Sequence, residues 1–203
     1  MAGAENGVAA GRRRQILDAA VRVFARQGFH ASRVSDIADE AGVAYGLLYH
    51  YFRSKDELLD TVFTERWALM LEAIRAADER DASAREKLED VAGFIVGSYQ
   101  HDPALMKVII VEVTRAANSF GQTHLAAIRQ AFDLIAGIVR GGQERGEFRG
   151  DIDPLFAAMA FYGVVEQQLT AWIFDALGAS ETDVADARER IVSTVCDGLV
   201  TRA

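Results

Sequence analysis

The sequence predicts an all-α protein with two parts, an N-terminal three-helix head that contains a helix-turn-helix and a larger C-terminal helical body, with about nine helices in total. Three observations favour this fold class. The 203-residue chain contains only two prolines, so long uninterrupted helices are possible. Apolar residues recur at three- and four-residue spacing, and no alternating strand pattern occurs. Half of the residues are apolar and 26% are charged, which is typical of a globular protein.

The composition excludes several classes of protein. Cys196 is the only cysteine, so the chain has neither an intramolecular disulfide nor a zinc site built from several thiolates. No apolar run approaches the roughly 18 residues that a membrane-spanning helix needs. Residues 1–14 carry their positive charge after a stretch of small residues and lack an apolar core, unlike a signal peptide. We therefore expect a cytoplasmic protein without a membrane partner.

The charge is divided unevenly along the chain, although its net value is −8. Residues 1–55 contain eight Lys and Arg and five Asp and Glu, which gives +3, so residues 56–203 carry −11. A basic head on an acidic body indicates that only the head meets an anionic partner. The four histidines show no metal-ligand spacing and no nucleophile-elbow or Walker motif is present, so we expect no enzyme, no metal site and no cofactor.

The head is expected to consist of three helices. They cover residues 12–27, 34–41 and 45–51. In the first helix one apolar stripe is formed by Ile16, Ala19, Ala20, Val23 and Phe24. Gly28 suits the C-cap of this helix, Ser32 the N-cap of the second, and Gly42 its end.

Six further helices are expected in the body, which we divide from the head after residue 53. They cover residues 54–77, 84–100, 103–117, 121–144, 154–177 and 182–201. Ser54 and Glu57 have the S-x-x-E spacing of a capping box at the start of the fourth helix. Pro103 and Pro154 suit first helical turns. The predicted domains are therefore 1–53, for DNA binding, and 54–203, for ligand binding and dimerisation.

A helix-turn-helix pattern lies within residues 34–52. Two short helices flank a tight turn at residues 42–44, and Ala38 is small where the helices would cross. Val43 and Leu48 can fill the space between them. The spacing alone leaves two alternatives open: a DNA-binding motif whose second helix enters the major groove, or an ordinary corner in a helical protein.

Residues 12–63 resemble the DNA-binding domain of the tetracycline-repressor (TetR) family of bacterial transcription regulators. The matching motifs are ILDAA at 16–20 followed by Phe24, GF at 28–29, DIA at 36–38, AGV at 41–43, GLLYHYF at 46–52 and KDELL at 55–59. The resemblance implies a repressor that binds a palindromic double-stranded DNA operator as a homodimer, with one half-site for each head.

The resemblance also implies which residues face DNA. They are Ser32, Arg33, Ala44, Tyr45, Gly46, Leu47, Tyr49, His50 and Lys55. Those from Ala44 to Leu47 would meet base edges, and those from Tyr49 onwards would reach the sugar-phosphate backbone. Ser32 and Arg33 would hold another phosphate at the start of the second helix. Arg33 departs from the family's usual Thr or Ser. Asp36 is expected to be a structural partner, because a carboxylate beside phosphates repels them.

The body resembles one subgroup of this family, the acyl-CoA-responsive regulators of fatty-acid degradation. The motifs are EVTRAAN at 112–118, GQERGEF at 142–148 and FYGVVEQQLTAWIF at 161–174, with HASRVSDIA at 30–38 in the head. They imply that a long-chain acyl-CoA or another hydrophobic small molecule is the effector. Candidate effector-binding residues are Phe94, Met106, Ile110, Arg115, Arg129, Phe132, Met159, Tyr162, Glu166 and Trp172.

Two other functions stay open at this point. One is a TetR-type regulator that responds to a drug, an antibiotic or another hydrophobic metabolite, and the other is a ligand-free scaffold or an adaptor that depends on a co-repressor. In either case the resemblance implies that the last two helices form the dimer interface. The residues expected on that face are Ala158, Gly163, Ala171, Val192, Val195 and Leu199, with Cys196 as a small buried residue nearby.

Overall fold

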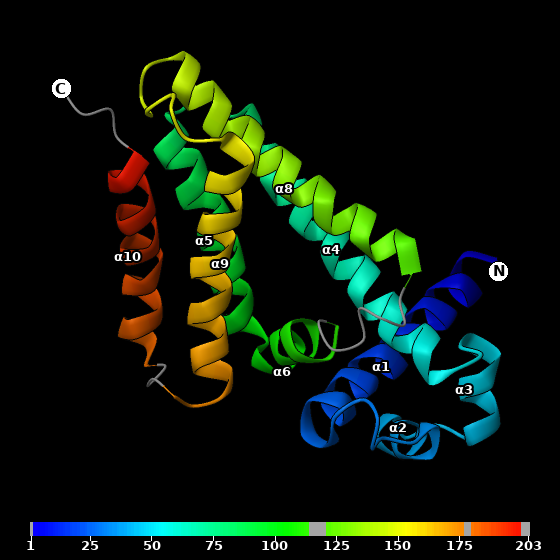
Figure 1. Cartoon of the computed structure of the whole chain (residues 1–203). Coiled ribbons are helices and arrows are strands. Elements are labelled where there is room, and N and C mark those ends of the chain that lie inside the picture. Colours follow the sequence, from blue (N-terminus) through cyan, green and yellow to red (C-terminus); the bar gives the residue numbers. More distant parts are fainter. Residues whose placement is uncertain (1, 114–120, 177–179, 200–203) are drawn as a thin grey trace. The chain divides into compact units, whose positions relative to one another are not determined.

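The computed structural model describes residues 2–113, 121–176 and 180–199, and this part of the chain is helical almost throughout (Figure 1). The elements are α1 (Ala2–Gln27), α2 (Val34–Ala41), α3 (Tyr45–Tyr51), α4 (Lys55–Glu79), α5 (Ala84–His101), α6 (Pro103–Lys107), the π-helix η1 (Val108–Val113), α8 (Gly121–Glu144), α9 (Pro154–Ile173) and α10 (Glu181–Leu199). The all-α prediction is confirmed. Among the described residues, no helix combines the length and the apolar character that crossing a membrane would require.

The chain forms two compact units, residues 1–66 with 104–120, and residues 67–103 with 121–203. Because α4 continues from Lys55 to Glu79, it contributes to both units. The first unit contains the helix-turn-helix together with η1, although η1 is distant from the helix-turn-helix in the sequence. The functional boundary that we predict after residue 53 stays a prediction.

The first unit is built around a core to which α1, α2, α3 and the start of α4 each contribute. Phe24, Ile37, Leu48 and Leu58 are fully buried, and the whole predicted apolar stripe of α1 faces this core. Removing a buried aromatic side chain of this kind costs about 3–5 kcal/mol of stability. This core therefore fixes the orientation of α3.

Two glycines end helices of the first unit in the left-handed region of the backbone. Gly28 has φ 81° and follows α1, and Gly42 has φ 62° and follows α2. The amide of Gly28 donates to the carbonyl of Phe24 at 2.8 Å, which closes the last turn of α1. An L-residue with a Cβ is strained at such φ values, so glycine suits both positions. Both C-cap predictions are confirmed.

Several predicted helix boundaries need correction. Helix α1 begins at Ala2 instead of residue 12, because the alanines of this segment favour helix despite three intervening glycines. The helix predicted over 103–117 is divided into α6 and η1, where four successive β-branched residues from Val108 to Val111 crowd a regular α-turn. Residues 114–117 lie outside the described part of the chain. Helix α9 ends at Ile173 instead of residue 177.

The second unit packs α5, α8, α9 and α10 together, and α5, α9 and α10 run side by side (Figure 1). Its core includes Ile95, Ile135, Phe161 and Val192, all 3% exposed or less. The indole of Trp67 donates to the carbonyl of Ala127 at 2.9 Å, which joins the middle of α4 to α8. Gly142 of α8 allows the start of α5 to approach closely.

Candidate functional site

Helix α3 exposes one side, and Leu48 on the opposite side holds the helix in the core. Leu48 is fully buried. The residues on either side of it are exposed, namely Ala44, Tyr45, Gly46, Leu47, Tyr49 and His50. The structure therefore brings six of the nine predicted DNA-facing residues together on one accessible surface. A helix of seven residues offers a short edge that fits the major groove of B-DNA.

Tyr45 and Tyr49 form a pair on this surface. Their hydroxyl oxygens lie 3.2 Å apart, and their rings meet edge to face with centroids 5.1 Å apart. The hydrogen bond with Tyr45 raises the pKa of Tyr49 above the usual value of a phenol. The phenol of Tyr49 therefore keeps its proton at physiological pH. Because one hydroxyl of the pair donates to the other, one hydrogen is left for an acceptor outside the chain.

The start of α2 differs from the prediction at Ser32. Its side chain is 4% exposed, and its hydroxyl donates to the carbonyl of Phe29 at 2.8 Å. The N-cap is Arg33, so the prediction that Ser32 caps α2 is wrong. The amide of Arg33 donates to the carboxylate of Asp36 at 2.9 Å, which confirms the structural role expected for Asp36. The side chain of Arg33 itself is exposed.

Lys55 lies at the first position of α4, and its ammonium points into the loop between α1 and α2. It donates to the carbonyls of Phe29 at 2.6 Å, Ser32 at 2.9 Å and His30 at 3.4 Å. The hydroxyl of Ser54 accepts from the amide of Glu57 at 3.1 Å, as a capping box requires. The carboxylate of Glu57 accepts from the amide of Arg53 and not from that of Ser54, so only half of the predicted box is formed.

Part of the positive charge of the head is used inside the first unit. Arg22 and Arg26 both pair with Glu40, and their hydrogen bonds hold the pKa of this carboxyl below its usual value. Arg13 pairs with Glu65 at 2.6 Å. Within the described part of the chain, Arg14 and Arg33 form no ion pair, so their charge is available to an anionic partner.

The predicted effector-binding residues fall into several groups. Phe132 and Tyr162 meet edge to face between α8 and α9, with centroids 5.4 Å apart, and burial raises the pKa of Tyr162. Trp172 is 4% exposed and stacks against Tyr99. Glu166 is half-buried, and burial raises the pKa of its carboxyl. Phe94 is also partly buried, on α5.

The remaining members of this set lie apart from these aromatic pairs. Met159 is 54% exposed and Arg129 is exposed, so neither lies in the interior of the body as described. Met106 and Ile110 belong to the first unit. Arg115 lies outside the described residues. Spacing along a helix could not separate interior from exterior here, because α9 is apolar on most of its faces.

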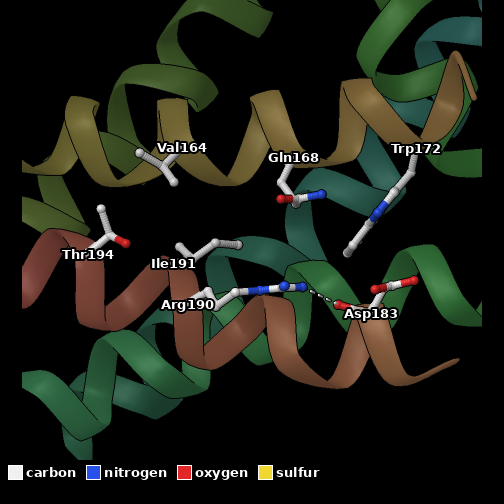
Figure 2. A pocket seen from close by; sticks show the side chains of 7 residues that line it. All are labelled: Val164, Gln168, Trp172, Asp183, Arg190, Ile191 and Thr194. Atoms are coloured by element: carbon white, nitrogen blue, oxygen red, sulfur yellow. Dashed lines mark hydrogen bonds between the residues drawn. The ribbon is translucent and has the colours of Figure 1, made fainter. Parts of the chain in front are cut away.

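A groove of about 440 Å³ opens between α9 and α10 in the second unit (Figure 2). It is lined by Val164, Gln168, Trp172, Asp183, Arg190, Ile191 and Thr194. The guanidinium of Arg190 donates to the backbone carbonyl of Asp183 at 3.1 Å. Trp172 is the one predicted effector-binding residue in this lining. Sequence reasoning missed Gln168 and Arg190, although a glutamine within the apolar α9 is a signal of a polar contact.

The structure corrects the predicted dimer face. Ala158, Val192 and Leu199 are at most 5% exposed within a single chain, so they cannot also cover a partner. Gly163 is exposed, and Ala171 and Val195 are partly buried. Cys196 is fully buried, as expected, and burial raises the pKa of its thiol to about 11. The exposed apolar row on α9 consists of Leu155, Phe156 and Met159, whereas the exposed Val164 faces the groove between α9 and α10.

Two family models together match most of the chain. Residues 16–62 match the model described as bacterial regulatory proteins of the tetR family, and residues 63–195 match the C-terminal region of YsiA-like proteins. The fatty acid metabolism regulator protein of Bacillus subtilis is 30% identical over 161 residues, which cover 79% of this chain and 83% of that protein. The transcriptional repressor KstR2 of Rhodococcus jostii is 30% identical over 198 residues, with 94% and 92% covered.

Two solved structures with the same fold also belong to regulators, both named FadR. The fatty acid degradation regulator FadR of Bacillus halodurans has a TM-score of 0.83 at 26% identity, with 94% of this chain and 97% of that one covered. The FadR of Bacillus subtilis, solved in complex with stearoyl-CoA, has a TM-score of 0.80 at 28% identity, with 92% and 98% covered.

Proposed function

Because the chain belongs to the TetR family of bacterial regulatory proteins, we propose that it is a dimeric repressor that a long-chain acyl-CoA or a related lipid releases from its operator. As a member of this family it is a transcriptional regulator and not an enzyme. The observation that carries the DNA half of the proposal is the exposed face of α3, which the buried Leu48 anchors. The similar FadR with stearoyl-CoA supports the class of effector. A regulator of chromosomal genes works in the bacterial cytoplasm.

On DNA, each head places α3 in the major groove of one half-site. Tyr45 supplies hydrogen bonds to base edges, Ala44 and Leu47 contact thymine methyl groups, and Gly46 permits close approach. Tyr49 and His50 reach the sugar-phosphate backbone beside the groove. Arg33 adds a charge at the start of α2. Because phosphate contacts release counterions, binding weakens steeply as salt increases.

The dimer is proposed to form through the last two helices, α9 and α10. The apolar row of Leu155, Phe156 and Met159 lies along the start of α9 and is 42–66% exposed in the single chain. An exposed apolar row of this kind is typical of a protein interface. Two heads on a symmetric dimer then read two half-sites of a palindrome.

The effector needs both an apolar tunnel and a polar anchor. Burying a dozen methylenes of an acyl chain contributes about 10 kcal/mol, at about 0.8 kcal/mol each. Association itself costs about 4–15 kcal/mol, so an apolar tunnel without a polar anchor gives only weak binding. We assign the tunnel to the interior beside two aromatic pairs, Phe132 with Tyr162 and Trp172 with Tyr99. Arg129, with the Arg115 that sequence alone suggests, is the candidate anchor for the phosphates of coenzyme A.

Release from DNA requires only a modest difference in effector affinity between two conformations. A hundredfold loss of DNA affinity corresponds to about 2.7 kcal/mol, which is within the usual range of coupling between sites. The effector would favour a spacing of the two heads that does not match the operator. Helix α4 contributes to both units of the chain and is the natural connection.

Native mass spectrometry of the protein as purified from bacteria tests the effector class. A co-purified mass equal to that of a long-chain acyl-CoA, displaced by added stearoyl-CoA, would support the proposal. Binding of aromatic cations or steroids in place of acyl-CoA would favour a sensor of another hydrophobic metabolite. No uptake of any of these compounds would favour a ligand-free scaffold.

A further inference from the structure

The ammonium of Lys55 is enclosed by backbone carbonyls of the loop between α1 and α2. The carbonyls of Phe29 and Ser32 accept from it at 2.6 and 2.9 Å, and that of His30 at 3.4 Å. The ring of Phe29 lies beneath the same ammonium, with its centroid 4.5 Å away. Four groups of one short loop therefore converge on a single side chain from the first turn of α4.

This arrangement uses the whole donor capacity of the lysine. An ammonium has three N–H donors and no acceptor, and each has a carbonyl within reach. Charge-assisted hydrogen bonds of this kind are stronger than neutral ones. A phosphate could replace a carbonyl only if that carbonyl lost its partner in a half-buried site, which costs free energy.

The loop that Lys55 holds leads directly into α2. The carbonyl of Ser32 belongs to the peptide that joins Ser32 to Arg33, and Arg33 is the N-cap of α2. The hydroxyl of Ser32 shares the carbonyl of Phe29 with Lys55, so both side chains fasten the same turn. The exposed Arg33 is therefore placed by contacts that lie beneath it.

We propose that Lys55 is a positioning residue, which fixes the loop 29–32 and so places Arg33 against the DNA backbone, instead of binding a phosphate itself. The inference rests on the proposed function, because Arg33 matters only if the head binds DNA. It assigns two of the sequence-predicted phosphate contacts, Ser32 and Lys55, to the support of a third.

The first arm of the test needs no DNA. We expect Lys55→Met, which keeps the length of the stem and removes the donors, to speed hydrogen exchange of the amides in residues 28–34 by about tenfold or more in the free protein. Lys55→Arg retains charge and donors and should keep most of the protection. Arg53→Met removes an exposed charge two residues earlier and should leave this exchange unchanged.

The second arm measures operator affinity against salt concentration in a double-mutant set. If Lys55 acts through Arg33, then Arg33→Ala makes the negative slope of log affinity against log salt less steep. Adding Lys55→Met to Arg33→Ala then changes the slope no further. A direct phosphate contact would remove a further 0.9 or so from the slope for each head. Where Lys55→Met fails to fold, Lys55→Gln replaces it in both arms, and Lys55→Arg stays the control that keeps the charge.

The outcomes separate this inference from the function on which it rests. If the wild-type chain binds operator DNA but Lys55→Met leaves the exchange of residues 28–34 unchanged, or the double variant loses more slope than Arg33→Ala, the positioning role is wrong. If the wild-type chain binds no DNA at any salt concentration, the proposed function fails, whatever the exchange of the loop shows.

Discussion

The hydroxyl groups of Tyr45 and Tyr49 lie 3.2 Å apart on the exposed face of α3, one helical turn from each other. One hydroxyl donates to the other, so the pair keeps one hydrogen for a partner outside the chain. If the pair contacts the operator as proposed, the base contact of one phenol and the backbone contact of the other depend on each other.

Removing either hydroxyl of this pair should weaken operator binding. We expect Tyr45→Phe and Tyr49→Phe each to lower affinity about 3- to 10-fold, which corresponds to the loss of a single hydrogen bond. The double variant should lose less than the product of the two, because each change already disturbs the shared bond. Fluorescence anisotropy with operator DNA measures all three, and Tyr51→Phe is the control from the same helix. Unchanged affinity in both single variants would remove the pair from the interface.

A methyl group at Gly142 should destabilise the body. A Cβ there would lie 2.6 Å from the Cβ of Ala84 and 2.8 Å from the ring of Phe148, closer than such atoms can approach. We expect Gly142→Ala to lower the free energy of unfolding by about 1–3 kcal/mol, measured by thermal or urea denaturation. Gly137→Ala on the same helix is the matched control. A Cβ at Gly137 meets nothing within 4 Å, so that variant should be neutral or slightly more stable.

Burial of Glu166 should make stability depend on pH. Its folded-state pKa is raised by burial, so the folded protein holds this proton to a higher pH than the unfolded chain does. The stability that the protonated form provides is present below the unfolded pKa and is lost as pH rises through the folded one. Glu166→Gln should therefore be more stable than wild type at pH 7, with little difference at pH 4.

Denaturation curves at the two pH values give this difference directly. Glu144→Gln, at the exposed end of α8, is the control and should change stability little at either pH. A Glu166→Gln variant that is less stable than wild type at pH 7 would show that the carboxylate has a partner that stabilises its charged form.

A charge on the apolar row of α9 should prevent dimer formation. Phe156 is 66% exposed in the single chain, and a dimer through α9 and α10 would bury it. We expect Phe156→Glu to give monomers by analytical ultracentrifugation and to lose operator affinity, because one head alone reads a single half-site. Leu125→Glu changes a residue of α8 that is 55% exposed and should leave the dimer intact. A dimeric Phe156→Glu variant would place the interface elsewhere.

The helix-turn-helix was readable from sequence because local signals determine it. The bounds of α2 and α3 match the prediction, since Gly42 can adopt a positive φ and Leu48 marks the buried side of a short helix. The position of Lys55 over the loop was not readable. Its partners are backbone carbonyls 23–26 residues away. Every residue has a backbone carbonyl, so the sequence does not indicate which carbonyls accept from Lys55.

The body was less readable for a related reason. Helix α9 is apolar on nearly every face, so periodicity could not tell the exposed Met159 from the buried Ala158 beside it. Which apolar face is covered by the same chain and which by a partner depends on packing between distant helices. The predicted effector-binding set is therefore divided between buried residues such as Trp172 and exposed residues such as Met159.

The most direct test is an anisotropy titration of the protein on the palindrome nearest its own gene, with acyl-CoAs of increasing chain length at constant salt. We predict tight binding to the palindrome, loss of binding at low micromolar long-chain acyl-CoA, and no response to short chains. Tight binding that no acyl-CoA disturbs would contradict the effector and leave a regulator of another hydrophobic metabolite. No binding to any palindrome of its operon would contradict the repressor itself.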